Sequence, residues 1–502
     1  MNQKIIIIAI IIVALIGAGA FAMTNLSSSG NASVNVDANA LEDRGNLIVD
    51  SKNIDTSKGL YHSDSADVNA ILVKNGGSLK LTDSILNKTG DTASTGDDAD
   101  FYGINSAILV NTNGTLDISN IEINTNSKGS NGIFVTNAEA SSTDSGESAQ
   151  GGEGQPPEAS GNGGEGGQPP EMPEGNGGDG GQAPDGNGGG QPGQTTIEGT
   201  TEATVKNVKI TTHSDKSRGL DATYNGIINA ENVIINTDGQ SCAGLATDRG
   251  EGQVHVKNSE INTGVSKDSG RGSPLIYSTG NITCENTKGT SYVSQIACIE
   301  GKNSIELTNC DLTGYAEGNR QDGDVYVDLG GVFIYQSMSG DADVGTSTFT
   351  AKDSELKIAE DSSVYKTAPM FHITNTACSI NLENTKCSFG SGTFLESSGQ
   401  NQWGSEGSNG GVCELNTTNE DINGNVIVDS ISSFTWNMKN TQFKGAINST
   451  GNTTVNVGEG STWTLTGDSS VSSLTVSGNI EYGDYSITVN GQKYDSSNPY
   501  NG

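Results

Sequence analysis

The sequence predicts an all-β fold, a single right-handed parallel β-helix, and two observations carry that prediction. Short segments with an apolar residue at every second position recur along most of the chain, which is typical of half-buried strands. A turn asparagine recurs with them at intervals of 25, 26, 28 and 23 residues, at Asn207, Asn232, Asn258, Asn286 and Asn309. A period of this length, built from short strands, indicates a solenoid in which each repeat forms one coil.

The repeated asparagine favours a solenoid over a β-sandwich. In a solenoid each strand lies about 4.8 Å from its own copy one coil later, so the apolar residues form inward ladders. The asparagines can form a side-chain ladder at a turn, because Asn tolerates left-handed backbone geometry. A sandwich needs turn signals about every 8–12 residues and gives the asparagine no reason to repeat.

The N-terminus is predicted to direct export. Residues 1–23 hold one early cation, Lys4, followed by an almost wholly apolar run, which fits either a signal peptide or a retained membrane anchor. An uncleaved segment would attach the protein to the membrane as a hydrophobic helix. Residues 24–46 are polar and are predicted to form a flexible stalk.

The coils are predicted in three blocks, with one interruption. Residues 47–137 carry the first coils, residues 195–452 the main coils and residues 453–502 the closing coils. Residues 138–194 consist largely of Gly, Gln, Pro, Glu and Asn and contain no Lys or Arg. Such a segment cannot bury enough apolar surface to order itself, so we expect a disordered insertion that loops out of one solenoid.

A second apolar phrase also recurs once per coil in the main block. Its copies are Arg218–Leu220, Ala243–Leu245, Pro274–Ile276, Ala297–Ile299, Val332–Ile334 and Met370–His372. We expect it to mark another inward face of the solenoid.

Composition narrows the setting and the partners. The 502-residue chain has a formal net charge of -34 and only 26 Lys and Arg residues, which excludes nucleic-acid binding and favours an extracellular, salt-exposed protein. The hydrophobic share of 32% suits a thin solenoid. The seven cysteines leave two alternatives open: buried small hydrophobic residues, or disulfides such as Cys378–Cys387 and Cys284–Cys310.

The phrases Gly272–Thr279, Ile299–Ile305, Leu307–Thr313 and Ile334–Asp341 carry a family resemblance. Through them the chain resembles adhesin-like right-handed parallel β-helix surface proteins of bacteria and methanogenic archaea, over most of residues 47–490. The resemblance implies a cell-surface protein whose loops bind glycans or cell-surface partners. It is specific for architecture rather than for a ligand.

Loops that project from the predicted coils supply the candidate binding residues. Trp403 lies in the polar loop 397–411 without apolar neighbours in sequence, so its ring is a candidate for stacking on a sugar. Tyr315 and Tyr326, in the loop 314–331, are further candidates. A role for Trp403 in capping the end of a coil is the structural alternative.

An acidic loop supplies the candidate metal ligands. Asp97, Asp98 and Asp100 crowd one short segment, and carboxylate oxygens are the ligands that Ca²⁺ prefers. A solvated acidic loop is the other interpretation. No other cofactor is predicted.

Catalysis is the main alternative function, because many right-handed β-helices cleave acidic polysaccharides. The sequence lacks the Asp pairs, the Gly-His-Gly turn and the Arg-x-Lys motif of the polygalacturonate hydrolases of this fold. A lyase-like cluster of Asp221, Asp248, Arg249 and Arg271 would form if coil stacking brought these residues together, although a surface ion ladder is the favoured interpretation. We therefore assign no catalytic residue. A structural cell-envelope spacer is the third alternative.

Overall fold

The computed structural model describes residues 34–94, 98–139, 198–267, 272–317, 320–321, 324–325, 330–337, 339–400 and 402–501. These residues belong to one compact unit, Val34–Gly502, whereas the unit Met1–Ser33 lies outside the described residues. The predicted targeting segment 1–23 is thus not described, and neither is most of the predicted insertion 138–194. Within the described ranges, no helix has the length and apolar character needed to cross a membrane.

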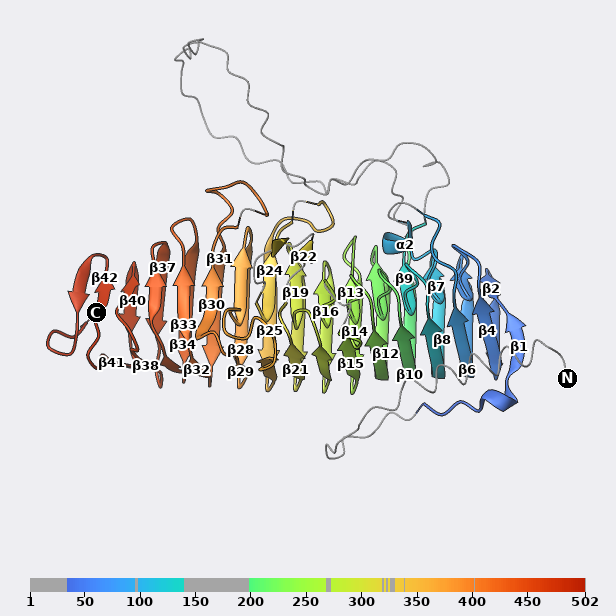
Figure 1. Cartoon of the computed structure of the whole chain (residues 1–502), viewed down its shortest axis with the longest axis horizontal. Coiled ribbons are helices and arrows are strands. Elements are labelled where there is room, and N and C mark those ends of the chain that lie inside the picture. Colours follow the sequence, from blue (N-terminus) through green and yellow to red (C-terminus); the bar gives the residue numbers. More distant parts are fainter. Residues whose placement is uncertain are drawn as a thin grey trace, which may run out of the picture. The chain divides into compact units, whose positions relative to one another are not determined.

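The chain folds as an all-β parallel solenoid in which strands lie side by side in chain order (Figure 1). The larger sheet has 21 strands: β1 (Glu42–Gly45), β3 (Asn53–Ser57), β4 (Gly59–Ser63), β6 (Ser78–Lys88), β8 (Thr115–Thr125), β10 (Glu202–Thr212), β12 (Ile227–Thr237), β14 (Gln253–Lys257), β15 (Glu260–Thr263), β17 (Asn281–Glu285), β18 (Lys288–Ser291), β20 (Ser304–Thr308), β21 (Asp311–Gly314), β25 (Thr346–Lys352), β26 (Glu355–Ile358), β28 (Ala377–Glu383), β29 (Lys386–Ser388), β31 (Val412–Thr418), β34 (Ser433–Lys439), β37 (Asn452–Val457) and β40 (Ser473–Val476). Its strands pair in parallel, each with its counterparts in the preceding and following coils.

A second parallel sheet of 13 strands contributes one strand per coil. Its strands are β2 (Leu47–Asp50), β5 (Ile71–Lys74), β7 (Ile108–Asn111), β9 (Ile133–Thr136), β11 (Leu220–Thr223), β13 (Leu245–Thr247), β16 (Ile276–Ser278), β19 (Ala297–Glu300), β24 (Val332–Tyr335), β27 (Phe371–Thr374), β30 (Thr393–Ser397), β33 (Asn425–Val428) and β36 (Ile447–Ser449). This sheet carries the candidate site described below.

Short elements complete the fold. They are the 3-10 helix η1 (Ala38–Ala40), the helix α2 (Asp98–Phe101), a sheet of β32 (Asp421–Asn423), β35 (Gln442–Lys444), β38 (Thr462–Thr464) and β41 (Asn479–Glu481), a sheet of β39 (Ser469–Val471), β42 (Ile487–Val489) and β43 (Gln492–Tyr494), and the pair β22 (Arg320–Gln321) and β23 (Asp324–Val325). Among the described strands, β22–β23 and β42–β43 are the antiparallel pairs.

Three of the repeated asparagines, Asn258, Asn286 and Asn309, form the predicted side-chain ladder at the turn. Asn232 bends the long strand β12 with φ +54°, and in the next coil Asn258, with φ +52°, separates β14 from β15. The Asn286 amide donates to the Asn258 side-chain oxygen over 3.0 Å, and the Asn309 amide donates to Asn286 over 2.7 Å. The left-handed bend lets one sheet cover two faces of each coil, and the side-chain bonds tie the bends together.

In-register pairing of the second sheet builds the core. One inward column consists of Leu220, Leu245, Ile276, Ala297, Val332 and Phe371, all with no exposed surface. The successive coils thereby bury apolar side chains that no single coil could bury alone. Toward the C-terminus the column thickens into aromatic packing, with Phe371 and Phe394 at 5.4 Å between ring centroids.

Five of the cysteines, Cys284, Cys310, Cys378, Cys387 and Cys413, pack in or against this core rather than in disulfides. All seven are free thiols, six of them buried and Cys387 half-buried. The predicted alternative bridges Cys378–Cys387 and Cys284–Cys310 are therefore wrong, and the interpretation as small hydrophobic residues is confirmed. Cys284 pairs with Leu307, as an aliphatic ladder position requires.

The solenoid begins earlier than the sequence predicted. Residues 24–46 were expected to be a polar stalk, but Glu42–Gly45 forms β1 and pairs in parallel with β4. The strand was missed because its side chains are largely exposed, so the alternation of apolar residues that signals a half-buried strand is absent. Parallel pairing continues into residues 453–502, where β40 pairs with β37.

Candidate functional site

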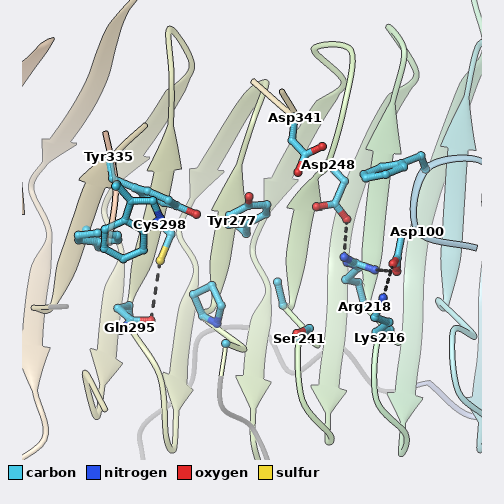
Figure 2. A pocket seen from close by; sticks show the side chains of 16 residues that line it. Asp100, Lys216, Arg218, Ser241, Asp248, Tyr277, Gln295, Cys298, Tyr335 and Asp341 are labelled. Carbon is cyan, nitrogen blue, oxygen red and sulfur yellow. Dashed lines mark hydrogen bonds and ion pairs between the residues drawn. The ribbon is translucent and has the colours of Figure 1, made fainter. Parts of the chain in front are cut away.

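The described residues enclose a groove on the outward face of the 13-stranded sheet (Figure 2). Its volume is about 340 Å³. The lining side chains come from five coils and three loops: Asp100, Phe101, Lys216, Arg218, Ser241, Ala243, Asp248, Gly272, Pro274, Tyr277, Gln295, Cys298, Phe333, Tyr335, Asp341 and Trp403. The site is therefore a product of coil stacking, with no contiguous motif in the sequence.

Strand register explains why Tyr277, Cys298 and Phe333 reach the groove. Side chains alternate between the two faces of a strand, so the neighbours of the inward column point outward. The outward row runs through Asp221, Ala246, Tyr277, Cys298, Phe333 and His372. This row changes from charged to aromatic along the solenoid, which gives the groove two chemically different ends.

Arg218 organises the charged end of the groove. Its guanidinium lies 2.7 Å from an Asp248 oxygen, 2.8 Å from Asp100 and 3.6 Å from Asp221. Lys216 adds a second cation to Asp100 over 2.8 Å. Because the Arg218 side chain is only 11% exposed, these are ion pairs in a largely dry setting, where removing one partner leaves an uncompensated buried charge.

Burial changes the protonation of this cluster. Burial raises the pKa of Asp248 to about 6, although Arg218 opposes the shift. Burial, together with the charge of Asp248, raises the pKa of Asp221 well above its usual range. The pair therefore retains protons to higher pH than exposed carboxyl groups do.

Arg249 joins two walls of the groove instead of entering this cluster. Its Nε donates to an Asp341 oxygen over 3.1 Å, in the loop that follows β24. Its guanidinium also lies 3.8 Å from the centroid of the Phe101 ring on α2, a cation–π contact. The two contacts fix the α2 wall against the loop that carries Asp341.

The other end of the groove is aromatic. Phe333 stacks on Tyr335 with ring centroids 4.5 Å apart, and the Trp403 ring lies 5.2 Å from Phe333 and 5.1 Å from Tyr335. Trp403 stays partly exposed in this packing. Beside it, Tyr277 donates to the buried carboxylate of Glu300 over 2.9 Å, and burial raises the pKa of Glu300. The arrangement offers apolar ring surface next to hydrogen-bonding groups.

Gln295 contributes a buried amide to the lining, next to Cys298 (Figure 2). The side chain is 2% exposed, and its oxygen accepts from Ser294 Oγ over 2.6 Å and from Cys298 Sγ over 3.8 Å. Its Nε2 donates to no atom of the described residues. A buried amide donor without an acceptor is costly, so this group is suited to an acceptor that a ligand would bring.

The structure places the predicted binding residues differently with respect to the groove. Trp403 lines the groove, where it packs on Phe333 and Tyr335. Tyr315 is not among the lining residues; its hydroxyl donates to Asp361 over 2.8 Å and its ring contacts Tyr292. Tyr326 lies outside the described residues.

The predicted metal ligands do not come together at one site. Asp97 lies outside the described residues, Asp98 accepts from Ser94 over 3.4 Å, and Asp100 is held by Lys216 and Arg218. Across the described ranges, no group of three or more His, Cys, Asp or Glu side chains has an arrangement that would hold a metal ion.

The predicted lyase-like cluster forms only in part. Asp221 and Asp248 do come together, but around Arg218, while Arg249 binds Asp341 and Arg271 lies outside the described residues. Sequence reasoning missed Arg218 as the centre, and also Gln295 and Tyr277. A signal was available for Tyr277 alone, which follows the inward residue Ile276 and therefore falls in the outward row.

Comparison with known proteins gives no further guide to this groove. No protein-family model and no curated protein sequence matches the chain.

Proposed function

We propose that this chain is an exported, cell-surface, adhesin-like protein, built as a right-handed parallel β-helix, whose groove binds a glycan. The observation that carries the proposal is the partly exposed Trp403 ring, set on Phe333 and Tyr335 at the mouth of a groove with hydrogen-bonding walls. Aromatic rings with adjacent polar groups suit the apolar faces and hydroxyl edges of sugars.

The setting supports this proposal. The apolar run within residues 1–23 predicts export, and attachment to the membrane if it is uncleaved. The net charge of -34 suits a salt-exposed surface. Parallel coils form a rigid scaffold, and the loops bearing Asp100, Asp341 and Trp403 add the walls.

A glycan array tests the proposal. Val34–Gly502 should bind a defined subset of glycans, and binding should survive about 1 M NaCl because the aromatic contact does not depend on charge. Trp403→Ala should lower the affinity about 10-fold through loss of ring contact. Tyr485→Ala removes another exposed ring, one outside the groove, and should leave binding unchanged. A glycan affinity that is the same in Trp403→Ala as in the wild type would contradict the proposal.

Cleavage of a polysaccharide is the second candidate, and the carboxyl pair favours it. Asp248 lines the groove with a pKa of about 6, next to Asp221, and a carboxyl group with such a pKa can act as a general acid. Incubation with polysaccharides would release new reducing ends or unsaturated products in this case. Release of either kind of product should then be lost in Asp248→Asn, while the glycan affinity of that variant stays measurable.

A further inference from the structure

The cations of the groove already have partners. Within the described lining, Lys216 lies 2.8 Å from Asp100, and Arg218 lies 2.7 Å from Asp248. The neighbouring Arg249 binds Asp341. An anionic sugar would have to displace one of these carboxylates from its cation, which would leave a buried carboxylate unpaired.

Among the described residues, carboxyl groups also outnumber the cations around the groove. Besides Asp100, Asp248 and Asp341, the buried side chain of Glu300 lies on the same outward face. They face three cations, Lys216, Arg218 and Arg249. The local field therefore disfavours a second anion in the groove.

One buried donor without a partner among the described lining residues is uncharged. Gln295 Nε2 is buried and donates to no described atom, while the oxygen of the same amide is occupied by Ser294 and Cys298. An N–H of this kind is satisfied by a hydroxyl or carbonyl oxygen. The aromatic end supplies the surface against which an uncharged ring would lie.

We infer that the groove selects an uncharged saccharide, with Gln295 Nε2 donating to one of its hydroxyl or acetamido oxygens and the Trp403–Tyr335 surface contacting its ring. This inference rests on the proposed glycan-binding function and narrows it. It excludes the acidic polysaccharides that the enzyme alternative named.

Calorimetry with oligosaccharides of matched length and different charge tests the inference. The probes are β-1,4-linked hexamers of glucose and of N-acetylglucosamine, both uncharged, a galacturonate hexamer and a deacetylated glucosamine hexamer. Val34–Gly502 should bind an uncharged hexamer at least about 10-fold more tightly than the galacturonate hexamer. Tighter binding of galacturonate or of glucosamine would overturn the inference and leave the glycan-binding proposal standing. No binding of any probe, together with a blank glycan array, would overturn both.

Two variants locate the donor. Gln295→Met keeps the side-chain length and removes the amide, and should weaken binding of the uncharged hexamer about 3- to 10-fold, the usual worth of one hydrogen bond. Gln253→Met makes the same change on β14, outside the groove, and should change nothing. Unaltered affinity in Gln295→Met would contradict the assignment.

A measurement on the wild-type protein tests the inference even if Gln295→Met misfolds. The affinity for the uncharged hexamer should stay constant between about 0.05 and 0.5 M NaCl, because no ion pair forms on binding. A marked loss of affinity with salt would show that a charged group carries the recognition and would overturn the inference.

Discussion

Single residues in this protein interact with the equivalent residues of the neighbouring coils. Asn286 adopts φ +51°, donates to Asn258 and accepts from Asn309. The same residue therefore relieves a backbone constraint and links three coils. The two contributions can be separated by substitution, because glycine accepts the backbone geometry without supplying the side-chain bonds.

We expect Asn286→Ala to lower the free energy of unfolding by about 1–2 kcal/mol, because alanine is strained in the left-handed region and cannot bond its neighbours. Asn286→Gly should cost less, since it keeps the geometry and loses the bonds alone. Urea unfolding of both variants gives the comparison. An equal loss in the two variants would show that left-handed strain contributes nothing at this turn.

Glu420 is a buried carboxyl group whose protonation should be visible in stability. It accepts from the Thr385 backbone N–H over 2.7 Å, and burial raises its pKa to about 7. A raised pKa means that the folded state holds the proton more tightly, so the stability from this group is complete below about pH 4.5 and is lost as the pH rises to about 7.

Glu420→Gln should remove that loss, because the amide oxygen can accept the same bond without ionising. We expect the variant to be more stable than the wild type by about 2 kcal/mol at pH 8 and to differ little at pH 4.5. Glu414→Gln, on the outward face of β31, is the matched control. A constant difference at both pH values would contradict the titration.

At the scale of elements, a buried lysine holds the segment that leads to the α2 wall. Lys88, the last residue of β6, has no exposed surface, and its Nζ donates to the carbonyl oxygens of Ser65, Thr89 and Gly90 over 2.7–3.0 Å. Burial lowers its pKa to about 8. The ammonium group thus links three carbonyls, and the Gly90 carbonyl also accepts from Asn105 Nδ2 over 3.1 Å.

Lys88→Met should lower the free energy of unfolding by about 2–4 kcal/mol, since three carbonyls lose this charged donor. Amide exchange in residues 89–94 and 98–106 should rise more than elsewhere, and glycan affinity should fall because Asp100 and Phe101 belong to this wall. Lys80→Met, on the exposed side of the same strand, should leave all three readouts unchanged. Uniform exchange across the chain in Lys88→Met would contradict a local role.

The sequence did not determine the strand register, that is, which residue of one strand pairs with which residue of the next. The alternation and the asparagine interval predicted parallel coils, and the ladder Asn258–Asn286–Asn309 confirms the spacing. The second phrase aligned Met370–His372 with Val332–Ile334, whereas the structure pairs Phe371 with Val332. A shift of one residue reverses the face of every side chain, so His372 points outward.

The site was less predictable for the same reason. Trp403 was found because an isolated aromatic residue in a polar loop is unusual. Arg218 stands alone in the sequence, and Asp248 and Asp100 become its partners only when loops and coils stack. Contacts across coils depend on loop lengths and register, neither of which periodicity determines.

At the scale of the whole molecule, acidity should shape the dependence of stability on pH. The raised pKa values of Asp248, about 6, and Glu420, about 7, make stability fall as the pH rises from about 4.5 to 7. Hydrogen bonds from Asn75 lower the pKa of Asp50, and those from Ser486 lower the pKa of Asp468, so their stability is lost below about pH 4. The net charge of -34 adds repulsion at neutral pH.

We therefore expect the highest Tm near pH 5, a lower Tm at pH 7.5, and partial recovery at pH 7.5 when about 0.5 M NaCl screens the surface charge. Scanning calorimetry of Val34–Gly502 between pH 5 and 8, with and without NaCl, measures the Tm. A Tm that rises steadily from pH 5 to 8 would contradict the raised pKa values.

Tryptophan fluorescence during a saccharide titration tests the central claim most directly. Trp436 and Trp463 are fully buried in the core, whereas Trp403 is partly exposed in the groove. An uncharged oligosaccharide that binds as proposed should shift the emission of the wild type to shorter wavelength with saturation, and the shift should vanish in Trp403→Phe although calorimetry still detects binding. A saturable shift that persists in Trp403→Phe, or binding that leaves the emission of the wild type unchanged, would contradict a ligand site in this groove.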